Sequence, residues 1–147
     1  MKEGKTVLLK NKEITGYAIR ALLYIADTGG VVPKREICEA MKIPTGYFDT
    51  MVRRAQQFGL VNSIMGAHGG YSLAKLPADI TLYDIYVAFE GKPDDGNCPV
   101  CKKPWSASGD VSCPIHTILQ DVAAHATQQL QQTTLQQLIE KRQLCYV

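Results

Sequence analysis

The sequence pattern that most limits the possible folds of this chain is a series of three amphipathic segments followed by a hairpin with a glycine-rich turn. Apolar residues recur every three or four positions in residues 14–26, 33–41 and 45–58, as one buried face of an α-helix requires. Pro44 separates the second segment from the third, because the residue before a proline avoids helical backbone angles. Two short helices joined by a turn of about four residues, after a longer first helix, are typical of a helix-turn-helix.

Short signals at the segment ends support these boundaries. Thr15, Thr45 and Thr81 are candidate N-caps of the first, the third and a fourth helix, because a threonine hydroxyl can accept from a free helix amide. Gly59 suits the left-handed position that follows a helix, and it comes directly after the third segment. Residues 60–64 and 71–74 alternate like strands around a glycine-rich turn. This pattern predicts a β-hairpin, which after a helix-turn-helix is a wing.

The third helix carries polar side chains suited to nucleic acid. In a helix-turn-helix this helix enters the major groove, where arginine suits guanine edges and phosphates, and hydroxyls suit phosphates. An ordinary solvated surface is the alternative, and for any single arginine it is the better one. Beside a wing, DNA contact is the stronger interpretation. The predicted DNA-binding residues are Thr45, Tyr47, Asp49, Thr50, Arg53 and Arg54 of the helix and His68 of the wing turn.

The last part of the chain is again helical in pattern. Residues 113–141 place apolar side chains at helical spacing, with a break suggested by Thr133 and Thr134. A helix this long has little of its own domain to pack against, which favours a dimerisation element. The predicted fold class is mainly α with a small β-hairpin wing: a winged helix-turn-helix plus a long C-terminal dimerisation helix. The expected divisions are a DNA-binding domain (1–91), a cysteine-containing sensor loop (92–112), and a dimerisation helix with a tail (113–147).

Residues 98–116 concentrate three of the five cysteines and one of the three histidines. Cys98 and Cys101 form a Cys-x2-Cys pair, and Cys113 and His116 form a Cys-x2-His pair eleven residues further on. Each short spacing lets two ligand atoms reach one metal, and the polar linker can fold back to close a four-ligand site. These four residues are therefore candidate metal ligands, in a loop long enough to need a bound centre for its order.

The spacing leaves the identity of the centre open. Zinc fits three cysteines and a histidine, and an iron–sulphur cluster with three cysteine ligands and a variable fourth group fits equally well. Free thiols that act as a direct cysteine switch are the third possibility. Elsewhere, Cys38 is expected in the core as a small hydrophobic residue, and Trp105 is expected to anchor the loop by packing.

Composition and charge limit the classes of function. The net charge is +2, with ten basic against six acidic residues in residues 1–71, so the N-terminal half is the better partner for a polyanion. No apolar run is long enough for a membrane span, and no export signal is evident, which predicts a cytoplasmic protein without a membrane partner. No catalytic triad, acidic pair or phosphate-binding loop accompanies these elements, so an enzyme is not expected.

The chain also carries an ordered series of short motifs. They are Tyr17–Ala26, Gly59–Val61, Gly66–Ala74, Ile80–Ile85 and Glu90–Gly91. Over nearly the whole chain this series resembles the Rrf-type winged-helix regulators, the IscR/NsrR/CymR-like group. The resemblance implies a homodimeric transcription regulator on a pseudo-palindromic operator in double-stranded DNA, with an iron–sulphur cluster on three loop cysteines. Cys113 and His116 look like the family's last cysteine and its ligand histidine.

Two features depart from that family. Cys101 follows Cys98 closely where the family spaces its cysteines about evenly, and Met65 stands in the wing where an arginine is common. The primary prediction is a dimeric DNA-binding regulator that senses iron–sulphur status or redox or nitrosative stress through a cluster on the four candidate ligands. The same regulator with structural zinc or a direct thiol switch is the first alternative. A metal-dependent protein-interaction module without DNA binding is the alternative of another class.

Overall fold

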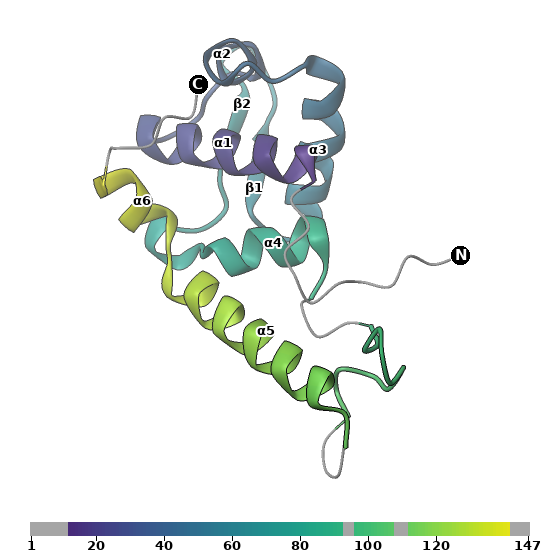
Figure 1. The fold of residues 1–147 in the computed structure, drawn as a ribbon. Helices are drawn as coiled ribbons and strands as arrows, with labels where there is room; N and C mark the ends of the chain where they lie inside the picture. Colours follow the sequence, from purple (N-terminus) through teal and green to yellow (C-terminus); the bar gives the residue numbers. More distant parts are fainter. Residues whose placement is uncertain (1–11, 93–95, 108–111, 142–147) are drawn as a thin grey trace.

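The computed structural model describes residues 12–92, 96–107 and 112–141 (Figure 1). The helices are α1 (Glu13–Thr28), α2 (Lys34–Met41), α3 (Thr45–Gln57), α4 (Leu82–Glu90), α5 (Pro114–Gln132) and α6 (Leu135–Lys141), with a 3-10 turn η1 (Pro77–Asp79). The strands β1 (Val61–Ile64) and β2 (Gly70–Leu73) form a two-stranded antiparallel sheet. The predicted class, mainly α with a hairpin wing, is confirmed. The prediction that the chain has no export signal rests on its N-terminal residues, and residues 1–11 lie outside the described part of the chain.

α1 is the central element of the core. It contacts α2, α3, α4, α6 and β2, and its apolar side faces all of them. Phe48 of α3, Ile85 of α4 and Leu135 of α6 are fully enclosed in this core, and Cys38 of α2 is buried there as expected. Burial of such side chains is the main favourable term in folding. We call residues 12–91 together with α6 the reader domain, because they share this one core.

The connection between α2 and α3 has the expected helix-breaking geometry. Lys42 ends α2 with left-handed backbone angles (φ 51°, ψ 50°). α3 then begins at Thr45, and the preceding residue is a proline, so no side chain caps the helix. The predicted N-cap role of Thr45 is therefore wrong. It is also wrong for Thr15, because α1 already begins at Glu13 and the side chain of Thr15 is buried inside the domain.

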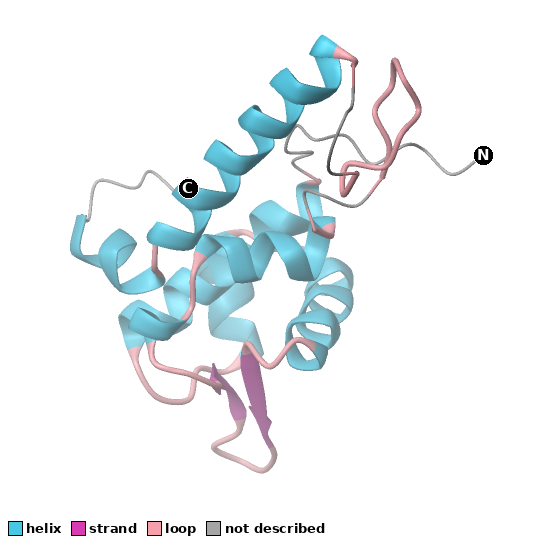
Figure 2. Ribbon diagram, turned by 90° about the horizontal axis from the view of Figure 1, so that it is seen from below, coloured by secondary structure: helices cyan, strands magenta, loops and turns pink. Residues whose placement is uncertain are grey.

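The hairpin is attached to the rest of the reader domain by the chain between α1 and α2. Val61 pairs with Leu73 at the base of the hairpin, and Val32 exchanges two backbone hydrogen bonds of 2.8 and 2.9 Å with Tyr71. Gly69 is required at the turn, because a Cβ atom there would collide with a carbonyl oxygen of β1. The hairpin therefore projects as a wing with a fixed base (Figure 2).

The predicted long C-terminal helix is divided in two. α5 ends at Gln132 and α6 begins at Leu135, so the break expected at Thr133 and Thr134 is confirmed. α6 packs back onto α1, whereas α5 projects away from the reader domain (Figures 1 and 2). None of the described helices is both long and apolar enough to cross a membrane.

The start of α4 holds the base of α5. Thr81 caps α4 as expected, because its hydroxyl accepts from the Asp84 N–H while the Asp84 carboxylate accepts from the Thr81 N–H. Directly beside this capping box, the Leu82 N–H donates to the Thr133 carbonyl over 2.9 Å. The turn between α5 and α6 is therefore bonded to the reader domain through the backbone.

Candidate metal centre and nucleic-acid interface

A tight turn, closed by a short antiparallel bridge, carries the first cysteine pair. Within it the Cys98 N–H donates to the Lys103 carbonyl (2.8 Å), and the Lys102 N–H donates to the Cys98 carbonyl (3.0 Å). Lys102 has a left-handed backbone angle, φ 63°. The chain therefore reverses its direction directly after Cys101, which leaves the thiol of Cys101 close to that of Cys98.

Backbone amides of this turn donate to both sulphur atoms. The amides of Val100 and Cys101 donate to Cys98 Sγ, and the amide of Lys103 donates to Cys101 Sγ. Burial raises the pKa of the Cys98 thiol, but these amides and the neighbouring thiols of Cys101 and Cys113 outweigh burial and leave this pKa below its ordinary value. The pKa of the Cys101 thiol is raised, by burial and by the neighbouring thiols of Cys98 and Cys113. The turn therefore stabilises a thiolate at Cys98 first.

The second pair lies at the start of α5. Cys113 is the N-cap residue, and a proline at the first helical position follows it, where proline is best tolerated. His116 is fully buried in the first turn, and its Nδ1 lies 3.5 Å from Cys101 Sγ. The ligand atoms of Cys98, Cys101 and His116 all lie within 4.8 Å of one another. The thiol of Cys113 is within hydrogen-bonding reach of both other thiols. The structure therefore groups three of the predicted ligands, Cys98, Cys101 and His116, and places the fourth, Cys113, beside the two other cysteines.

A small apolar cluster covers these groups. Trp105 is only 5% exposed, and its ring centroid lies 5.1 Å from that of His116, in the packing role expected for it. Leu119 and Ala123 of α5 pack against the same cluster. Among the described residues, neither Trp105 Nε1 nor His116 Nε2 has a hydrogen-bond partner. His116 therefore presents Nδ1 to Cys101 Sγ, while its Nε2 stays without a partner among the described residues, which is unusual for a buried polar group.

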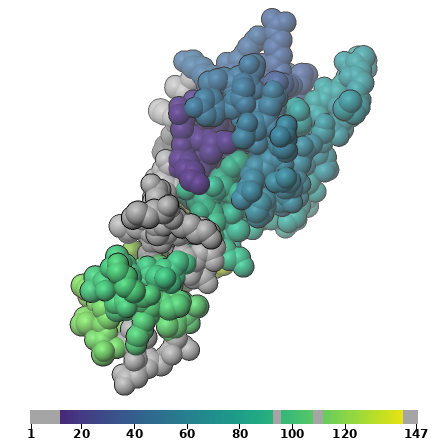
Figure 3. Space-filling view, turned by 90° about the vertical axis from the view of Figure 1, so that its right-hand side faces the viewer, coloured from purple at the N-terminus to yellow at the C-terminus, as the bar shows by residue number. Residues whose placement is uncertain are grey.

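Gln120 of α5 ties the loop to the helix. Its side-chain nitrogen donates to the carbonyl oxygens of Trp105 (2.6 Å) and Ala107 (3.4 Å). No signal in the sequence pointed to Gln120, because glutamines are common along this helix. We call residues 96–107 and 112–123 the metal lobe. It lies at the opposite end of the molecule from α2 and the wing (Figure 3).

The side of α3 that faces away from the core is polar and exposed. Asp49, Thr50 and Arg53 all lie on this side. In Figure 3 the blue residues of α3 and the teal residues of the wing are seen on the same face of the molecule. Asp49 forms a salt bridge of 2.6 Å with Lys34 of α2, and the Thr50 hydroxyl donates to the carbonyl of Gly46. Such a surface, with an uncapped helix start and the exposed cation of Arg53, is suited to phosphate groups.

The other predicted DNA-binding residues lie around this surface. Thr45 is exposed at the start of α3, and Tyr47 is 47% exposed with its ring centroid 5.4 Å from that of Tyr17. His68 is exposed in the turn of the wing, and neighbouring Met65 is 90% exposed. The structure therefore places all seven predicted residues in α3 and the wing, six of them with exposed positions on α3.

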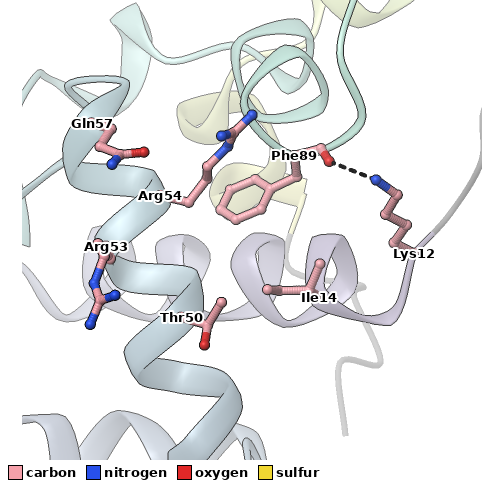
Figure 4. Close-up of a pocket in the computed structure, with 7 residues that line it drawn as sticks. All are labelled: Lys12, Ile14, Thr50, Arg53, Arg54, Gln57 and Phe89. Carbon is pink, nitrogen blue, oxygen red and sulfur yellow. Dashed lines mark hydrogen bonds between the residues drawn. The ribbon is translucent and has the colours of Figure 1, made fainter. Parts of the chain in front are cut away.

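A hollow of about 270 Å³ lies between α3, the start of α1 and the end of α4 (Figure 4). Arg54 crosses it: its Nε donates to the Ala88 carbonyl over 2.6 Å, and its guanidinium lies 4.9 Å from the ring centroid of Phe58. Arg54 therefore links α3 to α4, in addition to the DNA contact predicted for it. The lining residues are Lys12, Ile14, Thr50, Arg53, Arg54, Gln57 and Phe89.

The end of α4 is also fixed to α1. The Glu90 carboxylate accepts from the Lys12 N–H (2.8 Å) and from the Thr15 hydroxyl (2.5 Å), and Lys12 Nζ donates to the Phe89 carbonyl (3.5 Å). Glu90 thus supplies the acceptor at the start of α1 that no local residue provides. The last turn of α4, which precedes the metal lobe in the chain, is therefore bonded to both α1 and α3.

The architecture and these two sites define the class of protein: a winged helix-turn-helix DNA-binding regulator with an appended cysteine–histidine centre. The chain belongs to the Rrf2 family, iron-dependent transcriptional regulators, whose family model matches residues 12–141. This assignment confirms the predicted family, and it favours the regulator over an enzyme and over a protein-interaction module.

Individual relatives agree with this assignment. An HTH-type transcriptional regulator of Aquifex aeolicus is 30% identical over 84% of this chain and 86% of its own length. IscR of Pectobacterium atrosepticum is 29% identical over 89% of this chain and 79% of its own length. The solved structure of CymR, the global cysteine regulator of B. subtilis, superposes with a TM-score of 0.74 at 25% identity, over 91% of this chain and 98% of that chain. The structure of T. potens IscR gives a TM-score of 0.72 at 25% identity, with 93% of each chain covered.

Proposed function

We propose that this protein is a dimeric, cytoplasmic transcription regulator whose affinity for DNA is set by the state of the centre formed by Cys98, Cys101, Cys113 and His116. One observation carries the proposal. The ligand atoms of Cys98, Cys101 and His116 meet at the free end of a helix whose base is bonded to the DNA-reading domain, and the Cys113 thiol lies beside the other two thiols. A centre placed there has a direct structural connection to the reader.

The DNA-contacting surface of this proposal is the exposed side of α3 together with the wing. Arg53 supplies a cation for phosphates or guanine edges, and the uncapped start of α3 supplies free amides. His68 and the exposed Met65 lie in the wing turn. Met65 adds no charge there, so α3 carries most of the electrostatic attraction to DNA.

A second copy of the chain is proposed to cover α5. Ile115, Ile118 and Val122 are 42, 57 and 40% exposed and share one side of this helix, while other residues of α5 pack on Cys98, Trp105 and α4. Apolar side chains at a spacing of three and four residues form a stripe suited to a partner helix. The resulting two-fold dimer matches a pseudo-palindromic operator with half-sites about 34 Å apart.

The proposed centre couples DNA binding to a chemical signal. The donor set accommodates either the iron–sulphur cluster predicted from the sequence or a single zinc ion. An iron–sulphur cluster supplies redox and nitrosative sensitivity, whereas zinc supplies sensitivity to metal supply and thiol chemistry. In either case the chain's own contribution is the same: three thiolates and one imidazole held in a water-poor site by Trp105 and α5.

The test measures binding to a duplex from the regulator's own promoter region, by fluorescence anisotropy over a range of salt concentrations. We expect nanomolar to micromolar binding that weakens steeply with salt, and a change of at least tenfold between protein with its metal and chelated protein. Equal affinity in both states contradicts the coupling. Salt-independent or absent binding contradicts the DNA-reading role itself.

The dimer is tested separately by sedimentation. Replacing both Ile118 and Val122 with glutamate is expected to give a monomer that keeps its helical content but loses most of its DNA affinity, because linked half-sites raise effective concentration. Gln128→Glu is the matched control, since Gln128 is also exposed on α5 but lies away from the apolar stripe. A double variant that stays dimeric shows that the interface lies elsewhere.

A further inference from the structure

We propose that the centre holds one tetrahedrally coordinated metal ion, preferentially Zn²⁺, on three cysteines and one histidine, and not a multi-iron cluster. The inference deepens the proposed function, since it names the ligand of the same site. It rests on three features of the metal lobe: the distances between ligand atoms, the build of the first cysteine turn, and the position of the second pair on α5.

The ligand atoms lie as close together as a single ion requires. Around a tetrahedral Zn²⁺, with bonds of about 2.3 Å to sulphur and about 2.0 Å to nitrogen, neighbouring ligand atoms are about 3.5–3.8 Å apart. Cys101 Sγ and His116 Nδ1 are 3.5 Å apart, and one ligand atom from each of Cys98, Cys101 and His116 all lie within 4.8 Å of one another. In a cluster the protein ligands are divided between different irons with sulphide ions between them, so some of any three ligands must be more widely separated.

The first cysteine turn is built to offer two thiolates to one ion. Three backbone amides donate to Cys98 Sγ and Cys101 Sγ, and they offset the negative charge that accumulates when several thiolates share one ion. The left-handed Lys102 turns the chain immediately after the second sulphur. The spacing between Cys98 and Cys101 is shorter than the spacing in the family. This short spacing is the one that a single ion needs.

The second pair reaches the same point from the start of α5. Cys113 and His116 are three positions apart at the helix N-terminus, so they lie on the same face of the first turn. The packed ring of Trp105 shields the imidazole of His116 from water. The first cysteine turn supplies Cys98 and Cys101, and the helix start supplies His116 within the same group, with the Cys113 thiol beside both other cysteines as the fourth ligand of the proposed site. Four protein ligands on one ion are the form of structural zinc sites.

The direct test uses full-length protein produced and purified without oxygen from cells supplied with both iron and zinc. Metal analysis, acid-labile sulphide analysis and native mass spectrometry are expected to give about one zinc per chain, no sulphide and no visible colour. Two or more irons per chain with matching sulphide overturn the inference. Protein that holds no metal, and that takes up none when zinc is added, overturns it as well.

Cobalt and two histidine variants sharpen the result. Titration of metal-free protein with Co²⁺ is expected to saturate at one ion per chain, with the visible bands of a tetrahedral thiolate site. His116→Cys should keep one ion and shift these bands, because a fourth thiolate replaces the imidazole. His116→Gln should weaken cobalt binding at least tenfold. His125→Gln is the matched control, since His125 lies exposed on the same helix; cobalt spectra that are identical in all four proteins contradict the assigned site.

DNA binding measured on the same samples separates this inference from the proposed function. One zinc per chain together with absent DNA binding supports the single-ion site and contradicts the regulator. Salt-dependent DNA binding by protein that carries an iron–sulphur cluster supports the regulator and overturns the single-ion site.

Discussion

The reader domain and the metal lobe are stabilised in different ways. The reader domain encloses apolar side chains from five helices, with α1 at the centre, whereas the apolar cluster of the metal lobe contains only Cys98 and Trp105 as fully buried members. The reader domain is therefore ordered by burial of hydrophobic surface. The metal lobe has little such burial, and it relies on a few backbone hydrogen bonds and on the group that its candidate ligands would bind. The comparison teaches that the reader domain has a large apolar core of its own, whereas the metal lobe has a small one, so its order depends more on what the proposed ligands bind.

Removal of the metal should give the largest difference between the two parts of the chain. Binding to a structural site is largely folding free energy, of order 10 kcal/mol for zinc, so chelation should disorder the metal lobe and leave the reader domain folded. Trp105 is the single tryptophan of the chain, so its fluorescence reports on the lobe alone. We expect its emission to move to longer wavelength on chelation, with rapid amide exchange in residues 96–107 and unchanged protection in α1. Equal loss of protection in both parts would refute the division.

Truncation of a core side chain should destabilise the reader domain and not the metal lobe. Phe48 is fully buried, and Phe48→Ala should lower the free energy of unfolding of the reader domain by about 3–5 kcal/mol. Trp105→Ala removes a side chain of similar burial from the metal lobe and should leave the melting of the reader domain almost unchanged. Urea unfolding followed by circular dichroism compares the two. A comparable loss of stability in Trp105→Ala would show that the lobe supports the reader.

The two neighbouring arginines of α3 should separate stability from DNA binding. Arg54→Ala removes the hydrogen bond to Ala88 and should cost about 1 kcal/mol of stability. Arg53→Ala should leave stability unchanged and reduce the slope of log affinity against log salt by about 0.9 for each phosphate that the variant no longer neutralises. Thermal melts and salt titrations of both single variants provide the measurement. If Arg54→Ala alone changes the salt slope, the assignment of roles is reversed.

The smallest expected difference concerns thiol reactivity. Burial raises the pKa of the Cys38 thiol, so less of it is thiolate at neutral pH and its alkylation by iodoacetamide should be slow with or without metal. The thiols of the metal lobe should react quickly only after chelation. Mass spectrometry of alkylated peptides over time gives each rate. Fast alkylation of Cys38 in folded protein would mean that the core is more open than the structure indicates.

The helices and the hairpin of the reader domain could largely be predicted from the sequence, because each depends on residues that are close together in the chain. The apolar spacing of α1 to α3, the glycine-rich turn of the wing and the break at Thr133 all involve residues close in the chain. The four metal-site residues were also recognisable, because cysteine and histidine are rare and their spacing is short. What the spacing left open, one ion or a cluster, depends on distances that only the folded turn defines.

The failures of sequence reasoning involve pairs of residues far apart in the chain. Thr15 looked like a local cap, but its hydroxyl donates to Glu90, 75 positions away. Arg54 was predicted only as a DNA-binding residue, and nothing in the sequence indicated that its Nε also donates to the Ala88 carbonyl of α4. The segment after the predicted break at Thr133 and Thr134 was assigned to the dimerisation element, yet this segment, α6, returns Leu135 to the core. No periodicity or capping rule can identify a partner that arrives from another part of the chain.

α5 has a mechanical meaning that follows from its length and its attachment. Its 19 residues make it about 28 Å long, with its base bonded to α4 and the metal centre at its free end. It is a lever with its fulcrum at Thr133. From its length, a displacement of about 2.4 Å at the metal end turns the helix by about 5° at the fulcrum. In the proposed function, a small rearrangement of the ligands therefore reaches the reader domain as a rotation of α5 about Thr133.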